Sequence, residues 1–479
     1  MRLLLSLLFV FFALPALAAE THATLAKGGS GGWLNVTRPI TEADMQGRVV
    51  LLDFWTYGCI NCMQVVPDLE YLEQKFGDKL LIIGVHSAKF KGEQGSERIL
   101  AAAKRFGLKH PVINDSDFAI WNSFDVQAWP TFVVLGPDGQ EAARFSGEGH
   151  RSDLEDAITG VLPDSNTKTA SIASLLDTKE SGGVLSFPAR MAFYEIDNDN
   201  GLLFVADAGH NAILALDGDF KTVETYKGFH QPRGIVVVGD TLYVADTGNH
   251  QIKTIDLKTK KISVVAGTGR QGYDRSVQNG DALKTSLASP WDIEPLADGR
   301  IAIAMAGLHQ LWVYDPKTKT ASVLAGNGKE SIDDGAAIGT ASLSQPSGLS
   351  RDGDTLYFVD AESSALRQLK DGTITTLIGT GLFDFGLKDG TYPSALMQHP
   401  QGLFAENGKV YIADTYNNAL RIYDTKTKQL KTVTLPASTL SEPGDLMVVM
   451  GMALVVDTNH HAIKQIDLEK GTVKTVIGD

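Results

Sequence analysis

A short sequence unit recurs six times between Pro188 and the end of the chain. Each copy contains a proline, a short apolar strand and a second apolar strand, which ends in aspartate in five of the six copies. The second strands are residues 203–207, 242–246, 301–305, 356–360, 410–414 and 453–457. A polar turn and an alternating strand follow each of them. Copies spaced about 40–60 residues apart and built only of strands and turns indicate a β-propeller, because one blade cannot bury both of its faces alone. We therefore predict an all-β six-bladed propeller over residues 184–479.

The repeat resembles the NHL repeat, most clearly over residues 231–256 and 399–424, where a proline and glycine precede Tyr-Val-Ala-Asp-Thr or Tyr-Ile-Ala-Asp-Thr. The third copy departs from the pattern, with Met305 in place of the aspartate and Leu308 in place of the asparagine. We expect its turn to be held differently. Residues 184–187 are predicted to form a strand that closes the ring against residues 472–477.

The repeated aspartates could bind a metal or hold the turns. A carboxylate at a strand end most simply accepts hydrogen bonds from the N–H groups of its own turn, and we favour that role. The turn histidines receive the same interpretation; they are His210, His250, His309, His460 and His461.

The propeller also offers candidate ligand-binding residues. His230 and His399 precede blade-starting prolines and are expected near the axial mouth. The residues that follow each proline should ring that mouth, and they are Ala189, Arg233, Trp291, Ser347, Gln401 and Gly444. Arginine, tryptophan and glutamine at such a mouth suit a polar or peptide ligand.

The first half of the chain contains both of its cysteines, Cys59 and Cys62, directly after the apolar run 49–55. Two thiols three residues apart, where a strand gives way to a helix, are placed for reversible disulfide chemistry. A static disulfide is the alternative. A zinc site would need two further ligands, and no second Cys/His pair lies nearby in this segment, so we predict no metal.

Two further residues favour chemistry over a static disulfide. Asp53 lies in a run that otherwise predicts a buried strand, and a buried carboxylate is costly unless it has a partner or a function. Pro130 stands at the head of a later predicted strand, where a proline is tolerated. The remaining predicted elements are strands at 80–85, 112–113, 132–135 and 142–145 and helical segments at 96–106, 118–121 and 152–161.

Taken in order, these features resemble the thioredoxin superfamily, in its secreted, peroxiredoxin-related branch, over residues 33–162. The resemblance implies an α/β thioredoxin-like domain with Cys59 as the exposed nucleophile and Cys62 as the resolving thiol. It further implies that Asp53 is the proton acceptor, that Pro130 is a cis-proline beside the sulfurs, and that Trp55 and Trp129 support the site. A helix N-terminus stabilises a thiolate. The insert Ile60-Asn61 adds no cation, which favours a reductant over a strong oxidant.

Met1 and Arg2 are followed by an apolar run from 3 to 17, and the segment ends in Ala16-Leu17-Ala18. This pattern predicts a secretory signal over residues 1–18, cleaved after about Ala18, and hence export to a bacterial periplasm. The run is shorter than the ~20 residues that a membrane span needs. Residues 19–32 are expected to be a flexible lead-in, and 163–183 a linker in which 171–176 form a docking turn.

The formal net charge of -14, from 57 acidic and 43 basic residues, argues against two classes of partner. Nucleic-acid binding requires a basic surface, which this composition does not supply. The same balance disfavours peripheral contact with an anionic membrane.

Both halves together, with the segment 55–63, resemble the NHL-repeat-containing protein 2 family, although Gly58 stands where animal members usually carry another cysteine. The first hypothesis is an exported thiol–disulfide oxidoreductase with no cofactor beyond the redox-active Cys59–Cys62 disulfide. Its expected partners are protein thiols and disulfides, an unidentified electron donor or acceptor, and a protein or peptide at the propeller. The alternatives are a binding scaffold with a vestigial redox domain, and a lyase or hydrolase that uses a metal held by His230 or His399.

Overall fold

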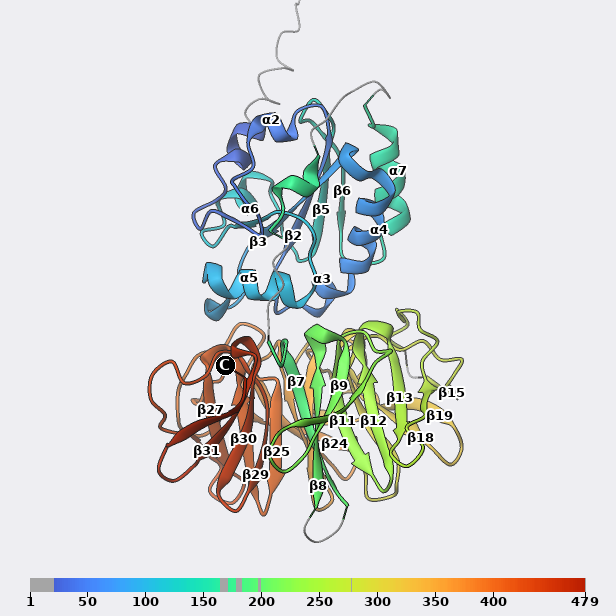
Figure 1. Ribbon diagram of the computed structural model, residues 1–479, viewed down its shortest axis with the longest axis vertical. Helices are drawn as coiled ribbons and strands as arrows, with labels where there is room; N and C mark the ends of the chain where they lie inside the picture. Colours follow the sequence, from blue (N-terminus) through green and yellow to red (C-terminus); the bar gives the residue numbers. More distant parts are fainter. Residues whose placement is uncertain (1–20, 164–170, 178–182, 197–199, 277, 479) are drawn as a thin grey trace, which may run out of the picture. The chain divides into compact units, whose positions relative to one another are not determined.

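The computed structural model describes residues 21–163, 171–177, 183–196, 200–276 and 278–478, so the predicted signal segment lies outside the described residues. The chain divides into two compact units, residues 1–180 and 181–479 (Figure 1). Within the described ranges, no helix has the length and apolar character required to cross a membrane.

The first unit is built on a mixed six-stranded sheet in the order β1-β4-β3-β2-β5-β6. Strands β2, β3 and β4 run parallel, whereas β1, β5 and β6 pair antiparallel with their neighbours. The strands are β1 (Trp33–Leu34), β2 (Val49–Trp55), β3 (Leu80–His86), β4 (Val112–Asn114), β5 (Thr131–Leu135) and β6 (Glu141–Ser146).

Helices cover both faces of this sheet, which is why every residue of β2 and β3 is buried. The helices are α2 (Glu42–Met45), α3 (Ile60–Gln64), α4 (Val66–Phe76), α5 (Ser96–Arg105), α6 (Ala119–Ser123) and α7 (Arg151–Gly160). Three short 3₁₀ segments are η1 (Gly77–Lys79), η2 (Lys91–Glu93) and η3 (Ile172–Leu175). Alternate residues of β2 enter two different cores, one with α4 and α7 and one with α2 and α6. The predicted α/β thioredoxin-like architecture is confirmed.

The expectation of a flexible lead-in is wrong for residues 21–32. A helical turn spans 21–26, and Leu25 is fully buried in the core beside β2. The backbone of Gly31 and Gly32 pairs with Asn114. The apolar Leu25, rather than the glycines after it, decides the conformation of this segment.

The linker interpretation is likewise wrong for residues 171–177, which pack on the first unit. The N–H of Thr37 donates to the carbonyl of Leu175 at 2.8 Å, and Leu176 forms a β-bridge with Val36. The docking turn predicted at 171–176 is thus confirmed as η3, and Leu175 joins the core.

The second unit is a six-bladed propeller of antiparallel sheets. The first blade consists of β7 (Pro188–Glu195), β8 (Gly201–Asp207), β9 (Ala212–Leu216) and β10 (Thr222–Tyr226). The second blade consists of β11 (Pro232–Val238), β12 (Thr241–Asp246), β13 (Gln251–Asp256) and β14 (Ile262–Ala266). The third blade consists of β16 (Pro290–Pro295), β17 (Ile301–Met305), β18 (Gln310–Asp315) and β19 (Thr320–Ala325), and β15 (Asn279–Asp281) pairs with the outer side of β19. The fourth blade consists of β21 (Pro346–Asp352), β22 (Thr355–Asp360), β23 (Ala365–Lys370) and β24 (Thr373–Ile378), and β20 (Gly335–Ala336) pairs with β24. The fifth blade consists of β25 (Gly402–Glu406), β26 (Lys409–Asp414), β27 (Ala419–Asp424) and β28 (Gln429–Thr432). The sixth blade consists of β29 (Pro443–Val449), β30 (Met452–Asp457), β31 (Ala462–Asp467) and β32 (Val473–Ile477). The repeated apolar strands of the sequence are the second strands of the blades. In five of the six blades a 3₁₀ segment follows the second strand, namely η4 (Ala208–His210), η5 (Thr247–Asn249), η6 (Ala306–Leu308), η7 (Thr415–Asn417) and η8 (Thr458–His460).

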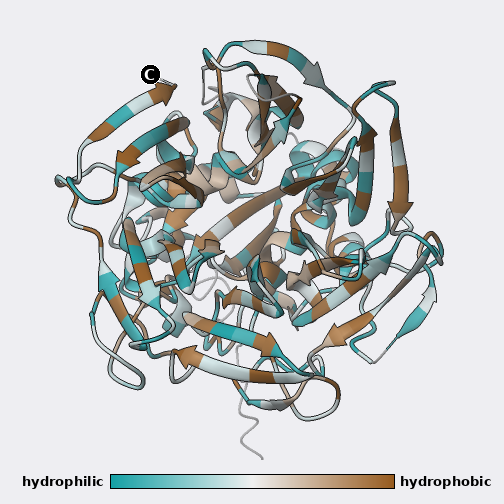
Figure 2. Ribbon diagram, turned by 90° about the horizontal axis from the view of Figure 1, so that it is seen from below, coloured by the Kyte–Doolittle hydropathy of each residue, from teal (hydrophilic) through white to brown (hydrophobic). Residues whose placement is uncertain are grey.

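The ring closes differently from the prediction. Residues 184–187 form no strand, and each blade is one continuous stretch of chain around the central axis (Figure 2). Strand β7 of the first blade contacts β29 of the last. A strand shared between the two ends of the unit is therefore not needed to complete the ring.

Side-chain hydrogen bonds join each blade to the next. The N–H of the residue before each blade-starting proline donates to a turn side chain of the preceding blade. The pairs are Gln231 to Asn211, Ser289 to His250, Gln345 to His309, His399 to Ser364, Glu442 to Asn418 and Phe187 to His461. We call these six bonds the blade latches. The last latch, from Phe187 to His461 Nδ1 at 3.0 Å, joins the first blade to the sixth.

The repeated aspartates have a structural role, and their bonds extend beyond their own turns. In four blades, Oδ2 of the carboxylate bonds a side chain of its own turn, namely His210, Asn249, Asn417 and His460. In all five, Oδ1 accepts from the backbone N–H two residues before a blade-starting proline, a partner that the prediction did not include. The pairs are Asp207 with Ser186, Asp246 with His230, Asp360 with Ser344, Asp414 with Gln398 and Asp457 with Ser441. In the third blade, Met305 Sδ accepts from Ala288 N at 3.3 Å, so this turn is held differently, as expected.

Candidate functional site

The two cysteines lie where β2 gives way to a helix. Cys59 is the N-cap of α3 and is partly exposed, whereas Cys62 lies in the first turn and is 1% exposed. Both are free thiols, and their side chains are in hydrogen-bonding contact. The arrangement presents one sulfur to an incoming group and keeps the second behind it.

The environment of Cys62 strongly favours the neutral thiol. Burial raises the pKa of Cys62 well above its usual value, and the contact with Cys59 acts in the same direction. The nearby carboxylate of Asp53 adds to this effect, while a backbone hydrogen bond from Thr56 opposes it. Cys62 therefore needs a proton acceptor before it can attack a disulfide, because the thiolate is the nucleophile.

Asp53 is the candidate for this acceptor. It lies in the middle of the sheet on β2, between Gly84 of β3 and Phe132 of β5, and is 2% exposed. Among the described residues, its Oδ1 has no hydrogen-bond partner. Burial raises the pKa of Asp53 to about 7, against the opposing influence of His110. A carboxyl group with this pKa can take up and release a proton near neutral pH.

Aromatic rings pack beneath the loop that carries the cysteines. Trp55 meets His86 edge to face at 4.9 Å, and Tyr57 stacks on the same imidazole at 5.4 Å. The backbone N–H of Tyr57 donates to His86 Nε2 at 3.3 Å. Burial lowers the pKa of His86 to about 3, so the ring stays neutral and Nε2 remains an acceptor. Sequence reasoning placed Trp55 here but missed His86, which is the last residue of an apolar strand.

Trp129 and Pro130 lie at the same edge of the sheet as that loop, because Thr131 pairs with Phe54. The Trp129–Pro130 peptide bond is cis. The indole N–H of Trp129 donates to the carbonyl of Ser87 at 3.0 Å, and its ring packs on Trp121.

A second buried carboxylate, Glu93, contacts this loop. It is fully buried at the end of η2 and accepts the N–H of Gly58 at 2.7 Å and the hydroxyl hydrogen of Thr56 at 2.7 Å. Nothing in the sequence distinguishes Glu93 from an ordinary loop glutamate, since the contact depends on how the segment after β3 folds back.

At the propeller mouth, the structure brings together three of the predicted residues. The guanidinium of Arg233 lies 4.5 Å from the centre of the Trp291 ring and donates to Gln401 Oε1 at 3.4 Å. The other candidates do not join them. Ser347 is fully buried and donates to the carbonyl of Pro400.

The two histidines predicted near the mouth lie in different environments and do not join this group. His399 is fully buried and stacks on Tyr416 at 4.3 Å, while His230 is exposed on another blade. Across the described residues, no group of three or more Cys, His, Asp or Glu side chains is arranged to hold a metal ion.

Arg190, which the sequence did not single out, closes the axis of the propeller. It donates to the carbonyls of Ser347, Gln401 and Gly444 and pairs with Asp292 and Asp445. A cavity of about 450 Å³ continues along the axis and contains further acidic residues, Glu294, Asp352 and Glu406. The signal for Arg190 was its position two residues after the first blade-starting proline, inside an apolar strand.

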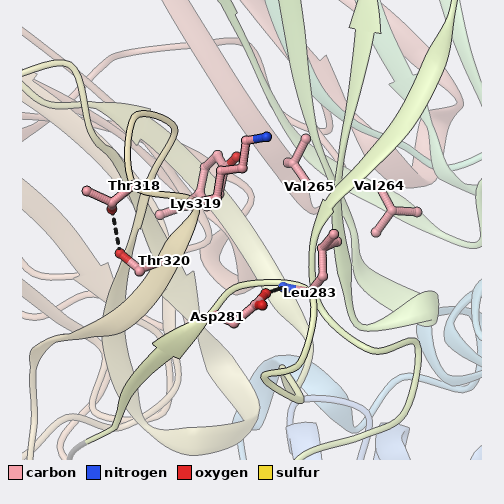
Figure 3. A pocket seen from close by; sticks show the side chains of 8 residues that line it. Val264, Val265, Asp281, Leu283, Thr318, Lys319 and Thr320 are labelled. Carbon is pink, nitrogen blue, oxygen red and sulfur yellow. Dashed lines mark hydrogen bonds between the residues drawn. The ribbon is translucent and has the colours of Figure 1, made fainter.

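Another hollow, of about 530 Å³, lies between the outer strands of the second and third blades (Figure 3). Val264, Val265 and Leu283 give it an apolar wall, and the hydroxyl groups of Thr318 and Thr320 bond each other at 2.8 Å. None of the predicted site residues lines it.

Comparison with known proteins agrees with this architecture. Residues 47–141 match the family model described as "Thioredoxin-like", and residues 229–255 match the NHL repeat. The chain therefore contains a thioredoxin-like domain and NHL-type repeats, in agreement with the fold of the two units.

Its relatives carry the same combination along most of the chain. It is 37% identical to Protein SUPPRESSOR OF QUENCHING 1, chloroplastic, of Arabidopsis thaliana, over 84% of this chain and 41% of that one. It is 35% identical to human NHL repeat-containing protein 2, over 84% of this chain and 62% of the relative. The chain thus spans less than two thirds of the length of these relatives. The first unit alone is 25% identical to the Bacillus subtilis thiol-disulfide oxidoreductase YkuV, covering 28% of this chain and 90% of that protein.

Proposed function

We propose that this protein is an exported thiol–disulfide oxidoreductase in which Cys59 and Cys62 exchange disulfides and the propeller binds a partner protein. The observation that carries the proposal is the pairing of a buried thiol, Cys62, with a buried carboxyl group, Asp53, whose pKa is about 7. A static disulfide would need no proton acceptor behind it. The likeness to a named thiol-disulfide oxidoreductase over the first unit supports the same class of reaction.

The proposed reaction has two steps. The Cys59 thiolate attacks one sulfur of a substrate disulfide, so that a mixed disulfide forms and the substrate's other sulfur leaves as a thiolate. Asp53 then takes the proton of Cys62, and the resulting thiolate attacks the Cys59 sulfur. The Cys59–Cys62 disulfide forms and the second substrate thiolate leaves. The pair has given two electrons to the substrate, and a dithiol protein must reduce it again.

The propeller is proposed to supply the affinity for the partner, through Arg233, Trp291 and Gln401 at its mouth. A stacked arginine and tryptophan beside an amide offers both an apolar face and hydrogen-bonding groups to a peptide. The variant Arg233→Ala is expected to lose partner capture while its rate with a small synthetic disulfide stays unchanged. Equal loss of both activities would contradict a separate binding role for the propeller.

Export is proposed from residues 1–18 and is tested by N-terminal sequencing of the mature protein after cell fractionation. We expect a periplasmic protein that begins near Ala19. A chain that retains Met1 in the cytoplasm would overturn this part of the proposal.

The variant Cys62→Ala tests the chemistry directly. Removing the resolving thiol should leave Cys59 joined to its substrate, so oxidising conditions should yield covalent complexes that a reducing agent releases. Cys59→Ala is the matched control and should form none. If neither variant forms complexes and the thiols of the native protein resist titration, the protein is a binding scaffold instead.

A further inference from the structure

The loop before Cys59 is held from below by a carboxylate. Glu93 Oε1 accepts the N–H of Gly58 at 2.7 Å. Its other oxygen, Oε2, accepts the hydroxyl hydrogen of Thr56 at 2.7 Å and the N–H of Phe90 at 2.9 Å. Two of these three donors belong to the loop, and one of them is the residue immediately before Cys59.

This arrangement is more than is needed to fix a loop. Glu93 is fully buried, and leaving a carboxylate in such a place is costly even when it is hydrogen-bonded. A neutral side chain could accept the same backbone hydrogen bond without that cost. What a carboxylate adds is a negative charge that is hydrogen-bonded to the residue immediately before Cys59.

We propose that Glu93 is a positioning residue that sets the reactivity of Cys59, by fixing the loop through Gly58 and Thr56 and by opposing negative charge on the neighbouring sulfur. The inference rests on the proposed function and deepens it. A carboxylate near a thiolate destabilises the thiolate, because like charges repel more strongly in a poorly solvated site. A less stable thiolate is a poorer leaving group, which makes the Cys59–Cys62 disulfide a weaker oxidant. Glu93 would thereby hold the pair on the reducing side.

Burial is the largest influence on the pKa of Glu93, and the ionisable groups around it have smaller effects. The charge of Lys89 favours ionised Glu93, while burial outweighs the hydrogen bonds and raises the pKa of Glu93 to about 7. His86 lies under Tyr57 as a neutral ring. Two cations of α5 also face this region, Arg98 through the carbonyl of Gly92 and Arg105 over the Tyr57 ring.

The test is the pH profile of Cys59 alkylation by iodoacetamide in the reduced full-length protein, which requires no substrate. Glu93→Gln removes the charge and nearly preserves the volume. We expect the midpoint of the profile to fall by about one pH unit, the effect of losing one nearby charge in a partly buried site. The equilibrium with glutathione should shift toward the reduced pair.

Two control variants separate charge from structure. Thr56→Val removes one hydrogen bond but keeps the charge of Glu93. Asp44→Asn removes another buried carboxylate that also accepts from a backbone N–H and a threonine hydroxyl, both of Thr41, in the same unit. Neither control should lower the midpoint. An unchanged midpoint in Glu93→Gln, or an equal shift in all three variants, would overturn the proposal.

A further measurement keeps the proposal testable if Glu93→Gln does not fold. The alkylation profile should show a second inflection near pH 7, where Glu93 titrates. Because Asp53 titrates in the same range, the inflection is sought in Asp53→Asn, where it should persist. A single inflection in that variant would refute the role of Glu93. Failure of the proposed function is distinct, since it would leave these profiles intact and abolish only the mixed disulfides of Cys62→Ala.

Discussion

Asp53 couples the stability of the first unit to its proposed chemistry, and Asp53→Asn should separate the two. Burial raises the pKa of this carboxyl group from 3.8 to about 7, a shift of about three units. Each unit corresponds to 1.36 kcal/mol, so the ionised form destabilises the fold by about 4 kcal/mol. The folded state binds more protons than the unfolded state between these pH values. The penalty is therefore absent below pH 3.8, grows as pH rises, and is complete above about pH 7.

The variant should accordingly be more stable than the native protein at pH 8, by up to about 4 kcal/mol, and little changed at pH 4. At the same time it loses the proton acceptor for Cys62, and removing a general base typically slows a step by about 10²–10⁴-fold. Urea unfolding followed by tryptophan fluorescence measures the first effect. The rate at which a mixed disulfide on Cys59 is resolved measures the second.

Asp44→Asn is the control for stability. Asp44 is also buried, but its hydrogen bonds with Arg38 hold its pKa well below the usual range. The ionised form is therefore favoured by the fold, and this variant should be less stable at pH 8, the opposite sign. An Asp53→Asn variant that is destabilised at pH 8, or that resolves the mixed disulfide at the native rate, would refute the reasoning.

Three further predictions concern the propeller. His461→Ala removes the latch that joins the first and sixth blades, and it should lower the free energy of unfolding by about 1–3 kcal/mol. His210→Ala, on an exposed turn, is the control and should lower it by less than about 1 kcal/mol. Equal losses of the two variants in thermal denaturation would contradict a stabilising role for the latch. Burial lowers the pKa of His250 to about 4, so the neutral ring contributes fully to the stability of the fold above pH 6.5. As pH falls toward 4, about 3 kcal/mol of the free energy of unfolding should be lost. Urea unfolding at several pH values measures this loss, and a free energy of unfolding that does not change with pH would count against it. Arg190→Met leaves buried carboxylates unpaired on the axis and should destabilise the propeller by about 3–5 kcal/mol, and adding Asp445→Asn should recover part of the loss in the same assay.

Local patterns were enough to predict the main elements of both units. The apolar runs of β2 and β3 predict strands because their side chains must leave water on both faces of a sheet. The repeat fixes the propeller because a single blade cannot bury its faces alone. Errors arose where one residue outweighed its neighbours. Leu25 buries a segment whose glycines indicated flexibility.

The candidate site divides in the same way. Spacing and order along one strand–helix unit are local properties, so they were sufficient to single out Cys59, Cys62, Asp53 and Pro130. The roles of Glu93 against the loop and of Arg190 on the propeller axis became visible only in the folded chain. A buried charge is stabilised by partners distant in sequence, and no local pattern records which loops or blades will supply them.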